Sequence, residues 1–276
     1  MKGLPLLLLA GLMVILPGCA TLPSDPAALA VSRANNDPLE PMNRELFALN
    51  QVIDRMLLKP VAKIYVRFIP QPARDAIRNL LKNFDEPVVF ANAALEGRFR
   101  PAGTTASRFA INSTVGLAGL FDVAARHGLE RQQADFGRTL HAWGIPEGPY
   151  LILPVVGPSS PRDAVGSGVD IYVSPWRYVA INNNYPTGLT VAQMGLSGID
   201  ERSRNIDSLD EIQRESVDYY ATFRSLYRQN RAAELGETAA PSTLAAPSNP
   251  AEPAKSGQPP VDFYSDPDQP QPHPPP

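Results

Sequence analysis

The sequence contains one cysteine and three histidines among 276 residues. A single cysteine cannot form an intramolecular disulfide, and no cluster of cysteine, histidine and carboxylate residues has the spacing of a metal site. Only two histidines, His127 and His141, lie outside the proline-rich C-terminal region, so the base that a nucleophilic enzyme requires is scarce. We therefore expect no metal, no cofactor and no enzymatic activity.

One catalytic arrangement remains as an alternative, a serine hydrolase that would combine Ser159 or Ser160 with His141 and Asp163. The two serines lie in Gly-Pro-Ser-Ser-Pro, whereas α/β-hydrolases place the nucleophile in Gly-x-Ser-x-Gly. A serine before Pro161 is also a common start of a helix, with the serine as cap and the proline in the first turn. Helix capping is the simpler explanation of this segment.

Long hydrophobic runs are also missing, because no run reaches the roughly 20 apolar residues of a membrane-spanning helix. The run over residues 4–16 has thirteen apolar or small residues, follows Lys2 and ends just before Cys19. This pattern is typical of a secretory signal peptide, and the lone cysteine directly after it favours lipidation over a core cysteine or cleavage elsewhere. We predict a signal peptide over residues 1–18 and a flexible tether over residues 19–36.

The segment Leu16-Pro17-Gly18-Cys19 resembles the bacterial lipobox, in which the cysteine is acylated and the chain is cleaved just before it. Pro17 stands where the lipobox usually has Ala or Ser. Ala20, rather than Asp, follows the cysteine, which resembles lipoproteins sorted to the outer membrane. The resemblance implies a lipid anchor at Cys19 and an outer-membrane location that faces the periplasm.

Proline is abundant, and twelve of the 30 prolines lie in residues 236–276. Phe263 and Tyr264 are the only aromatic residues there, so the segment has too little apolar surface to offset the entropy cost of ordering. We predict a disordered C-terminal tail. A short binding motif around the two aromatic residues is the alternative.

The net charge is −3, whereas a nucleic-acid-binding domain is expected to be basic, so nucleic acid is not an expected partner. One region is nevertheless basic, with six lysines or arginines between positions 59 and 82. At helical spacing, Lys63 and Arg67 share one face, and Arg74, Arg78 and Lys82 share another. Contacts with anionic lipid headgroups, each contributing about 1 kcal/mol, and an ordinary solvated helix face remain alternatives here.

Residues 37–235 are predicted to form one mainly helical domain, because apolar residues recur at helical spacing and no segment alternates long enough for a confident strand. The first apolar stripe consists of Met42, Leu46, Leu49, Ile53 and Met56. We expect this helix to start with Asp37 as its cap and to end at Pro60. Later helices are expected up to about residue 84, over residues 87–96 with a stop at Gly97, and from a capping box at Ser208 to residue 235.

The most hydrophobic piece of the mature chain is residues 109–121, thirteen residues without a charge. This length is too short to span a bilayer, so we expect either a buried core helix or a helix half-immersed at a membrane surface. Gly116 and Gly119 in this run are predicted to allow another helix to approach closely. Gly195 and Gly198 are predicted to favour tight packing beside a later apolar stripe.

Residues 135–163 are the densest run of unusual residues, with five prolines and four glycines around the apolar residues 150–153. Loops of this composition usually lie in water, but an apolar one must bury against a protein core or lipid. The notable motifs are Asp135-Phe136-Gly137, Thr139-Leu140, Trp143-Gly144, Gly148-Pro149-Tyr150, Leu153-Pro154, Gly157-Pro158-Ser159 and Arg162-Asp163.

These motifs resemble the MlaA or VacJ family of outer-membrane phospholipid-transport lipoproteins, and residues 36–44 resemble the opening motif of the same family. The candidates for family-motif or channel-loop residues are Asn43, Phe136, Gly137, Trp143, Gly144, Gly148, Pro149, Tyr150, Pro154, Gly157, Pro158, Arg162 and Asp163. The resemblance extends over most of the mature chain.

The resemblance implies a ring of amphipathic helices in the inner leaflet of the outer membrane, with a central polar channel. It implies that phospholipids misplaced in the outer leaflet pass to a soluble periplasmic lipid carrier for return to the inner membrane, and that the protein associates with trimeric porins. We hypothesise that the loop over residues 144–161 is a hinge at the channel. A structural or adhesive outer-membrane lipoprotein, which binds protein partners and moves no lipid, is the alternative.

Overall fold

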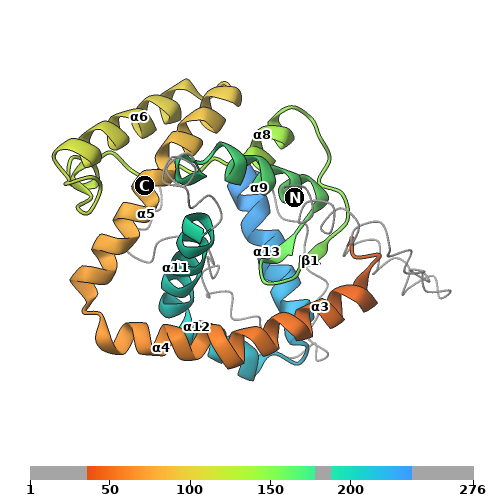
Figure 1. Cartoon of the computed structure of the whole chain (residues 1–276). Helices are drawn as coiled ribbons and strands as arrows, with labels where there is room; N and C mark the ends of the chain where they lie inside the picture. Colours follow the sequence, from red (N-terminus) through yellow and green to blue (C-terminus); the bar gives the residue numbers. More distant parts are fainter. Residues whose placement is uncertain (1–35, 178–187, 238–276) are drawn as a thin grey trace, which may run out of the picture.

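The computed structural model describes residues 36–177 and 188–237. The predicted signal peptide, Cys19, nearly all of the tether and the proline-rich tail from residue 238 onward lie outside the described residues. The described chain is mainly helical, and its helices follow one another around a ring (Figure 1). The prediction of a mainly α, annular domain is therefore confirmed.

The ring is built in chain order. One edge is formed by α3 (Glu40–Ile53), the π-helical turn η1 (Asp54–Leu58) and α4 (Lys59–Phe68). The next two edges contain α5 (Gln71–Leu95), α6 (Phe99–Thr114), α7 (Val123–Arg126), α8 (Phe136–Ala142), β1 (Leu151–Leu153), β2 (Gly157–Ser159) and α9 (Pro161–Val173). The last helices are α11 (Gly188–Arg204), α12 (Ile206–Glu215) and α13 (Tyr219–Leu235). In Figure 1, α13 closes the side opposite α5, and α11 lies inside the frame.

The first helix differs from the prediction at both ends. Asp37 does not cap it, because Leu39 occupies the cap position and the Asp37 side chain is buried among polar groups described below. Pro60 does not end it either, since the chain continues as a helix to Phe68. The π-helical turn directly before Pro60, in which the Lys59 amide donates to the Asp54 carbonyl, accommodates the proline in the first turn of α4.

The prediction of separate helices up to residue 84 and over residues 87–96 is wrong, because α5 runs without a break through Pro87. Tertiary packing explains the difference: Asn83, before the proline, hydrogen-bonds Ser113 and the Ala118 carbonyl. Val89 and Ala93, after it, pack beside Ala102 of α6. Packing of both halves against α6 outweighs the cost of about 3 kcal/mol for a proline in a helix. The predicted stop at Gly97 is confirmed, with φ of +74°.

The C-terminal helical region is also divided differently from the prediction. Ser208 lies inside α12 and caps nothing, whereas the chain bends after Glu215 and the Asp218 carboxylate caps α13 by accepting from the Ala221 amide. The predicted end is confirmed, because Gly236 takes the left-handed conformation that closes α13. Aromatic side chains of α13 surround Phe47 of α3, with ring centroids 5.3–5.6 Å apart, and join the two ends of the ring.

The Gly/Pro-rich segment contains a short antiparallel hairpin, which the sequence did not predict. Strand β1 pairs with β2 so that Ile152 faces Pro158. Strands of three residues are too short to show alternation, so the pattern gave no signal. The predicted helix start after the hairpin is confirmed, because the Ser160 hydroxyl accepts from the Asp163 amide and Pro161 occupies the first turn.

Side chains are distributed in an unusual way, since buried polar and charged residues outnumber buried apolar ones among the described residues. Large apolar side chains instead lie on the outside, including Met56, Phe68, Phe99, Val115, Leu117 and Trp143. No helix in the described part of the chain is long and apolar enough to cross a membrane.

Residues 109–121 are neither one helix nor a buried core. Helix α6 ends at Thr114, and Leu117 and Ala118 take positive φ values in an exposed turn. Gly119 confirms the expected close approach, because a Cβ there would lie 2.4 Å from the Asn83 side chain of α5. The expectation for Gly195 and Gly198 is wrong: open space surrounds both positions, because this part of α11 faces a cavity rather than a helix.

Candidate functional site: a charged cavity inside the ring

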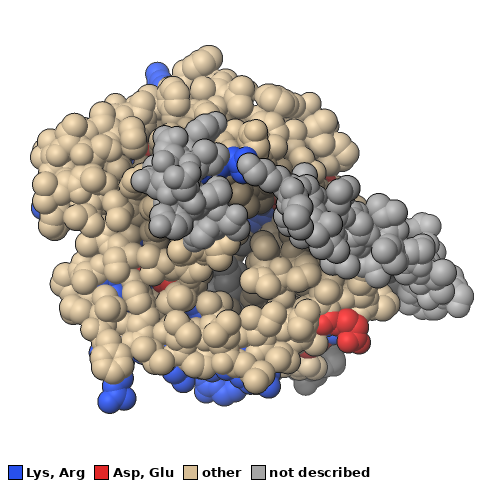
Figure 2. All heavy atoms as spheres, in the orientation of Figure 1, with Lys and Arg blue, Asp and Glu red and all other residues tan. Residues whose placement is uncertain are grey.

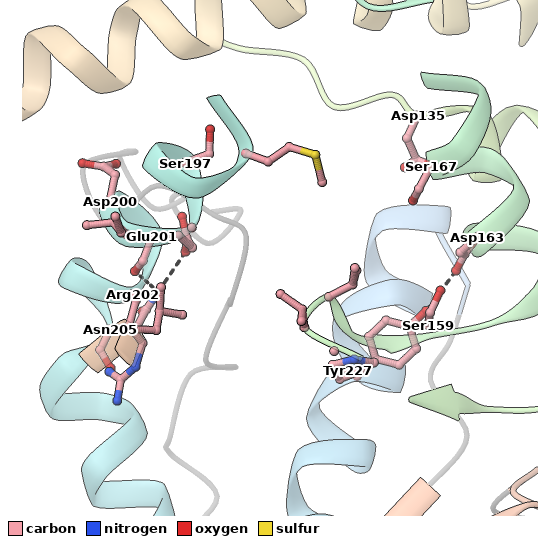
Figure 3. A pocket seen from close by; sticks show the side chains of 18 of the residues that line it. Asp135, Ser159, Asp163, Ser167, Ser197, Asp200, Glu201, Arg202, Asn205 and Tyr227 are labelled. Carbon is pink, nitrogen blue, oxygen red and sulfur yellow. Dashed lines mark hydrogen bonds between the residues drawn. The ribbon is translucent and has the colours of Figure 1, made fainter. Parts of the chain in front are cut away.

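The ring encloses a cavity of about 1400 Å³, which α3, η1, α5, α9, α11, α13 and the hairpin line. Figure 2 shows the molecule hollowed near its centre. In Figure 3, labelled side chains of α11 face labelled side chains of α9, α13 and the hairpin across open space. The lining alternates between apolar side chains, such as Val88 and Met194, and ionisable ones, such as Asp85 and Arg202. Such a lining offers contacts to a ligand that is itself both apolar and charged.

The wall formed by α13 and α9 contains a buried ion-pair network. The Arg231 guanidinium donates to Asp163 at 2.8 Å and to Asp135 at 2.8 Å. The Tyr227 hydroxyl donates to the other oxygen of Asp163 at 3.0 Å (Figure 3). Burial opposes the charge on Asp163, but the hydrogen bonds and charge of Arg231 outweigh it and hold the pKa of Asp163 below its ordinary value. This carboxylate is therefore ionised at neutral pH.

The opposite wall combines α5 and α11. Asp200 and Arg204 of α11 pair at 3.0 Å, and the amide of Asn205 donates to Glu201 at 2.8 Å. Burial raises the pKa of Glu201, while the charge of Lys82 on α5 lowers it. Lys82 and Glu201 both line the cavity.

A further ion-pair network fixes α11 to the first edge of the ring. Arg202 donates to both carboxylate oxygens of Asp54 in η1, at 2.7 and 3.1 Å. Asp210 of α12 pairs with Lys59 at 2.7 Å, and this contact lowers the pKa of Asp210. Bidentate arginine–carboxylate pairs define orientation as well as position. The π-helical turn thus holds the helix that crosses the ring.

The backbone of the α5–α6 corner is held by charges outside the cavity. Glu86 is almost fully buried and accepts from Arg108 at 3.1 Å, and Arg108 also pairs with Asp122 at 2.8 Å. Asp122 accepts a further hydrogen bond from the Asn112 side chain. This network connects α5, α6 and the start of α7.

The carboxyl of Asp85 faces the cavity from α5, and burial raises its pKa to about 6 despite the opposing charge of Arg131. The neighbouring carboxylates of Glu86 and Asp170 raise it further. Burial likewise raises the pKa of Asp170, although the Phe136 amide and the Asn92 side chain both donate to its carboxylate. Acidic groups therefore exceed basic ones at this position.

Two asparagines of α3 hold strand β1 through its backbone. The Asn43 side chain donates to the Tyr150 carbonyl at 3.0 Å and accepts from the Ile152 amide at 2.9 Å. Asn50 repeats the pattern, donating to the Leu153 carbonyl and accepting from the Val155 amide. Seven helical residues rise about 10.5 Å and three strand residues about 10 Å, so the two spacings match. The asparagine side chains of α3 thus make the backbone hydrogen bonds that a neighbouring strand would otherwise make.

Asn43 and Tyr150, both predicted from the family motif, are brought together in this contact and are buried. The Asn43 amide also donates to Asp37 at 2.8 Å, and Tyr220 and Arg224 of α13 donate to the same carboxylate. Asp37 is therefore the polar centre of the junction between the two ends of the ring.

The predicted residues of α8 have structural roles. Gly137 lies against Gly166 of α9, where a Cβ on Gly166 would be 2.3 Å from the Gly137 nitrogen, so only glycine fits. Phe136 packs edge-on against Trp143 at 5.8 Å. Trp143 is about half exposed, and its indole nitrogen donates to the Leu95 carbonyl. Arg162, the buried neighbour of Asp163, lies 3.3 Å from the His141 ring.

The remaining predicted loop residues are divided between turns and cavity. Gly144, Gly148 and Gly157 have φ between +81° and +100°, which favours glycine. Pro149 leads into β1, and Pro154 lies exposed at the tip of the hairpin. Of the thirteen motif candidates, the cavity lining includes Gly157, Pro158 and Asp163.

The predicted basic residues fall into two groups. Lys63 and Arg67 are exposed on α4, where lysine and arginine side chains gather along one edge of the molecule (Figure 2). Arg78 and Lys82 instead line the cavity, with Arg78 buried and paired with Asp75 at 2.6 Å. Arg74 is half-buried at the start of α5.

The described residues do not form the catalytic arrangement of the serine hydrolase alternative. The Ser160 hydroxyl accepts from the Asp163 amide, and the Ser159 hydroxyl donates to the Ser160 carbonyl. His141 contacts Arg162 and Glu237 instead. Neither serine has a histidine as its partner among the described residues, so the capping interpretation holds.

Sequence reasoning missed the wall formed by α11, including Asp200, Glu201 and Arg202, and it missed Asp85 and Arg131. A weak signal exists for Asp85, which interrupts the apolar face of α5 at helical spacing from Leu81 and Val88. Charged residues on α11 give no signal, because a helix face that borders a cavity has the same composition as one that borders solvent.

A helical annulus with apolar side chains outside and a charged cavity inside is the class that the fold and site define. The chain belongs to the MlaA lipoprotein family, whose model matches residues 35–234. The described ring lies almost entirely within this match.

Related proteins support the assignment. The chain is 36% identical over 200 residues to the "Intermembrane phospholipid transport system lipoprotein MlaA" of Haemophilus influenzae, a match that covers 71% of this chain and 77% of the relative. It is 32% identical over 219 residues to the protein of the same name from Escherichia coli K12, with 78% and 82% covered. A solved structure described as "Structural basis for maintenance of bacterial outer membrane lipid asymmetry" has a TM-score of 0.64 at 33% identity, covering 72% of this chain and 98% of that one.

Proposed function

We propose that this protein is an outer-membrane lipoprotein, anchored through Cys19, that removes mislocalised phospholipids from the outer leaflet. The lipids pass through the central cavity to a soluble periplasmic carrier and return to the inner membrane, which maintains lipid asymmetry. The ring sits in the inner leaflet beside trimeric porins, and its cavity opens to the periplasm.

One observation supports this proposal most strongly: large apolar side chains surround the outside of a ring whose cavity combines charged and apolar side chains. Phe68 and Phe99 are 71% and 76% exposed, which is costly in water but favourable among acyl chains. The cavity offers charged groups for a headgroup and apolar groups, such as Val88, for the rest of a lipid. The names of the relatives point to the same substrate class.

The surface basic residues Lys63 and Arg67 are proposed to contact headgroups at the rim of the ring, since they are exposed beside the apolar side chains of Ile64 and Phe68. Each such contact contributes about 1 kcal/mol at an anionic surface. The cavity-facing Arg78 and Lys82 are proposed to contact headgroups inside.

Passage through the cavity is tested by blocking it. Gly198 borders the cavity and has open space around it, so Gly198→Trp would fill part of the passage without disturbing a packed contact. Gly103→Trp on the exposed side of α6 is the matched control. In a strain that lacks the gene, we expect labelled surface phospholipid to rise. Wild type and Gly103→Trp should restore the low level, and Gly198→Trp at equal abundance should not.

Two results would overturn the proposal in different ways. Full restoration by Gly198→Trp would exclude this cavity as the route. A deletion strain with normal surface phospholipid would favour the alternative, a structural or adhesive lipoprotein that transports no lipid.

We also propose that the segment over residues 144–161 is a hinge at the channel. Gly144, Gly148 and Gly157 give it the needed backbone freedom, and residues 155–159 border the cavity. A disulfide between Asn50→Cys and Val155→Cys would lock the hairpin onto α3, since these residues already contact each other. Lipid export should fall when the disulfide forms and recover on reduction. Unchanged export would remove the hinge from the mechanism.

A further inference from the structure

The cavity-facing side of α5 presents charges of both signs. Arg78, Lys82 and Asp85 lie on one helix face at spacings of four and three residues. The same face continues with Val88 and Val89, which also line the cavity. A molecule lying along α5 would therefore meet positive charge, then a carboxylate, then an apolar surface.

Asp85 is the member of this series whose charge is least compensated. It makes no hydrogen bond or ion pair with any residue that the structure describes, although burial removes much of its hydration. The charges that act on its pKa are those of Arg131, Glu86 and Asp170, and Arg131 already lies 3.6 Å from Glu86. A half-buried carboxylate that accepts no hydrogen bond is unfavourable, so a cation from a ligand would be stabilised here.

The positively charged end of this helix face differs from Asp85, because its side chains interact with carboxylates. Arg78 is buried and held by Asp75, and the charge of Lys82 lowers the pKa of Glu201 on α11. Lys82 and Asp85 are three residues apart, about 4.5 Å along the helix axis. In a phosphoethanolamine group two carbons separate the phosphate ester oxygen from the amine, a separation of the same order.

Resting on the proposed function, we propose that this face of α5 is a subsite for zwitterionic phospholipid headgroups, in which Arg78 and Lys82 face the phosphate and Asp85 binds the ammonium group. The glyceride end of the lipid then contacts Val88 and Val89. A headgroup that has the phosphate but an uncharged alcohol in place of the amine leaves Asp85 unpaired. The protein therefore prefers aminophospholipids to phosphatidylglycerol.

The test uses the full-length protein purified in detergent and incubated with mixed micelles of equimolar phosphatidylethanolamine and phosphatidylglycerol. After repurification, both bound lipids are quantified by mass spectrometry. We expect wild type to retain phosphatidylethanolamine over phosphatidylglycerol by about fivefold, the order of one partly screened ion pair. Asp85→Asn should bring the ratio close to one, Lys82→Gln should lower both lipids together, and Asp207→Asn on the exposed face of α12 should behave as wild type.

A second ligand keeps the test decisive if a variant fails to fold. N-acetyl-phosphatidylethanolamine has the phosphate but no ammonium, so wild type should bind it no better than phosphatidylglycerol. Equal retention of all three lipids by wild type would overturn the subsite and leave the proposed function intact. Retention of no phospholipid at all would contradict both.

Discussion

The outer surface of the ring and its cavity wall differ in the polar side chains that they hold. The outside exposes large apolar side chains such as Phe68 and Phe99, whereas the cavity wall places arginine–carboxylate pairs among apolar side chains such as Met194. In a water-soluble fold, apolar burial supplies most of the stability. Here the buried apolar clusters are small, so polar contacts must define the geometry of the ring, and the apolar exterior is available for lipid.

Removal of an interior charge should lower the free energy of unfolding more than any other change considered below. Arg231→Met leaves the carboxylates of Asp163 and Asp135 without their main partner, and breaking a buried pair costs about 3–5 kcal/mol. Chemical denaturation in detergent measures the free energy of unfolding. Arg214→Met, an exposed residue of α12, is the control and should change it by less than about 0.5 kcal/mol. Equal effects of the two substitutions would show that interior charges do not define the ring.

Removal of the asparagine side chains that hydrogen-bond the hairpin should cause the next largest loss of stability. Asn43→Ala leaves the buried Tyr150 carbonyl and Ile152 amide without that partner, which costs about 2–3 kcal/mol. Asn50→Ala makes the equivalent change nearer to solvent and should cost about 1 kcal/mol. Hydrogen exchange at the amides of Ile152 and Val155 reports each contact separately. Unchanged protection at Ile152 in Asn43→Ala would contradict the assigned role.

The pH dependence of stability tests the role of Asp85 in the cavity wall. Here removal of a charge should raise the free energy of unfolding rather than lower it. Its folded-state pKa of about 6 lies above the unfolded value, so the native state binds an extra proton between about pH 4 and pH 6. The stability associated with this group is present below pH 4 and is lost as the pH rises through 6. Asp85→Asn should therefore increase the free energy of unfolding by about 2 kcal/mol at pH 7.5 and change it little at pH 4. A difference from wild type that is the same at both pH values would refute this explanation.

The outer surface should give the smallest effect on stability. Phe68→Ser and Phe99→Ser replace side chains that are mostly exposed, so each should change the free energy of unfolding in detergent by less than about 0.5 kcal/mol. Binding of the protein to liposomes should nevertheless weaken. Leu81→Ser, at a buried position that borders the cavity on α5, is the contrast and should destabilise the fold by more than about 2 kcal/mol. Loss of stability in the two phenylalanine variants would mean that their side chains are packed.

Local signals in the sequence predicted the local features correctly. Ser160 and Pro161 start α9, and Gly97 and Gly236 end α5 and α13, because caps and stops depend on a few neighbouring residues. The uninterrupted course of α5 through Pro87 was not predictable in this way. It depends on contacts with α6, such as the hydrogen bond between Asn83 and Ser113, which lie 30 residues apart in the chain.

The site was predictable only where it coincides with motif residues. Asn43, Tyr150 and Asp163 were found, but as family motif and loop residues rather than through their contacts. The role of Asp37 was misread, since a carboxylate before a helix suggests a cap and its true partners on α13 are distant in sequence. The charged residues of α11 gave no signal because only the closed ring distinguishes a cavity from solvent.

The central claim is that the ring lies in a bilayer and keeps a water-filled cavity, and two methionines test it directly. Met56 is exposed on the outside, and Met194 lines the cavity. The full-length protein in lipid nanodiscs is treated with a water-soluble oxidant, and sulfoxide formation at each methionine is followed by mass spectrometry. We predict rapid oxidation of Met194 and strong protection of Met56, with the protection of Met56 lost once the protein is unfolded. Oxidation of Met56 as fast as that of Met194 in the nanodisc would contradict the claim.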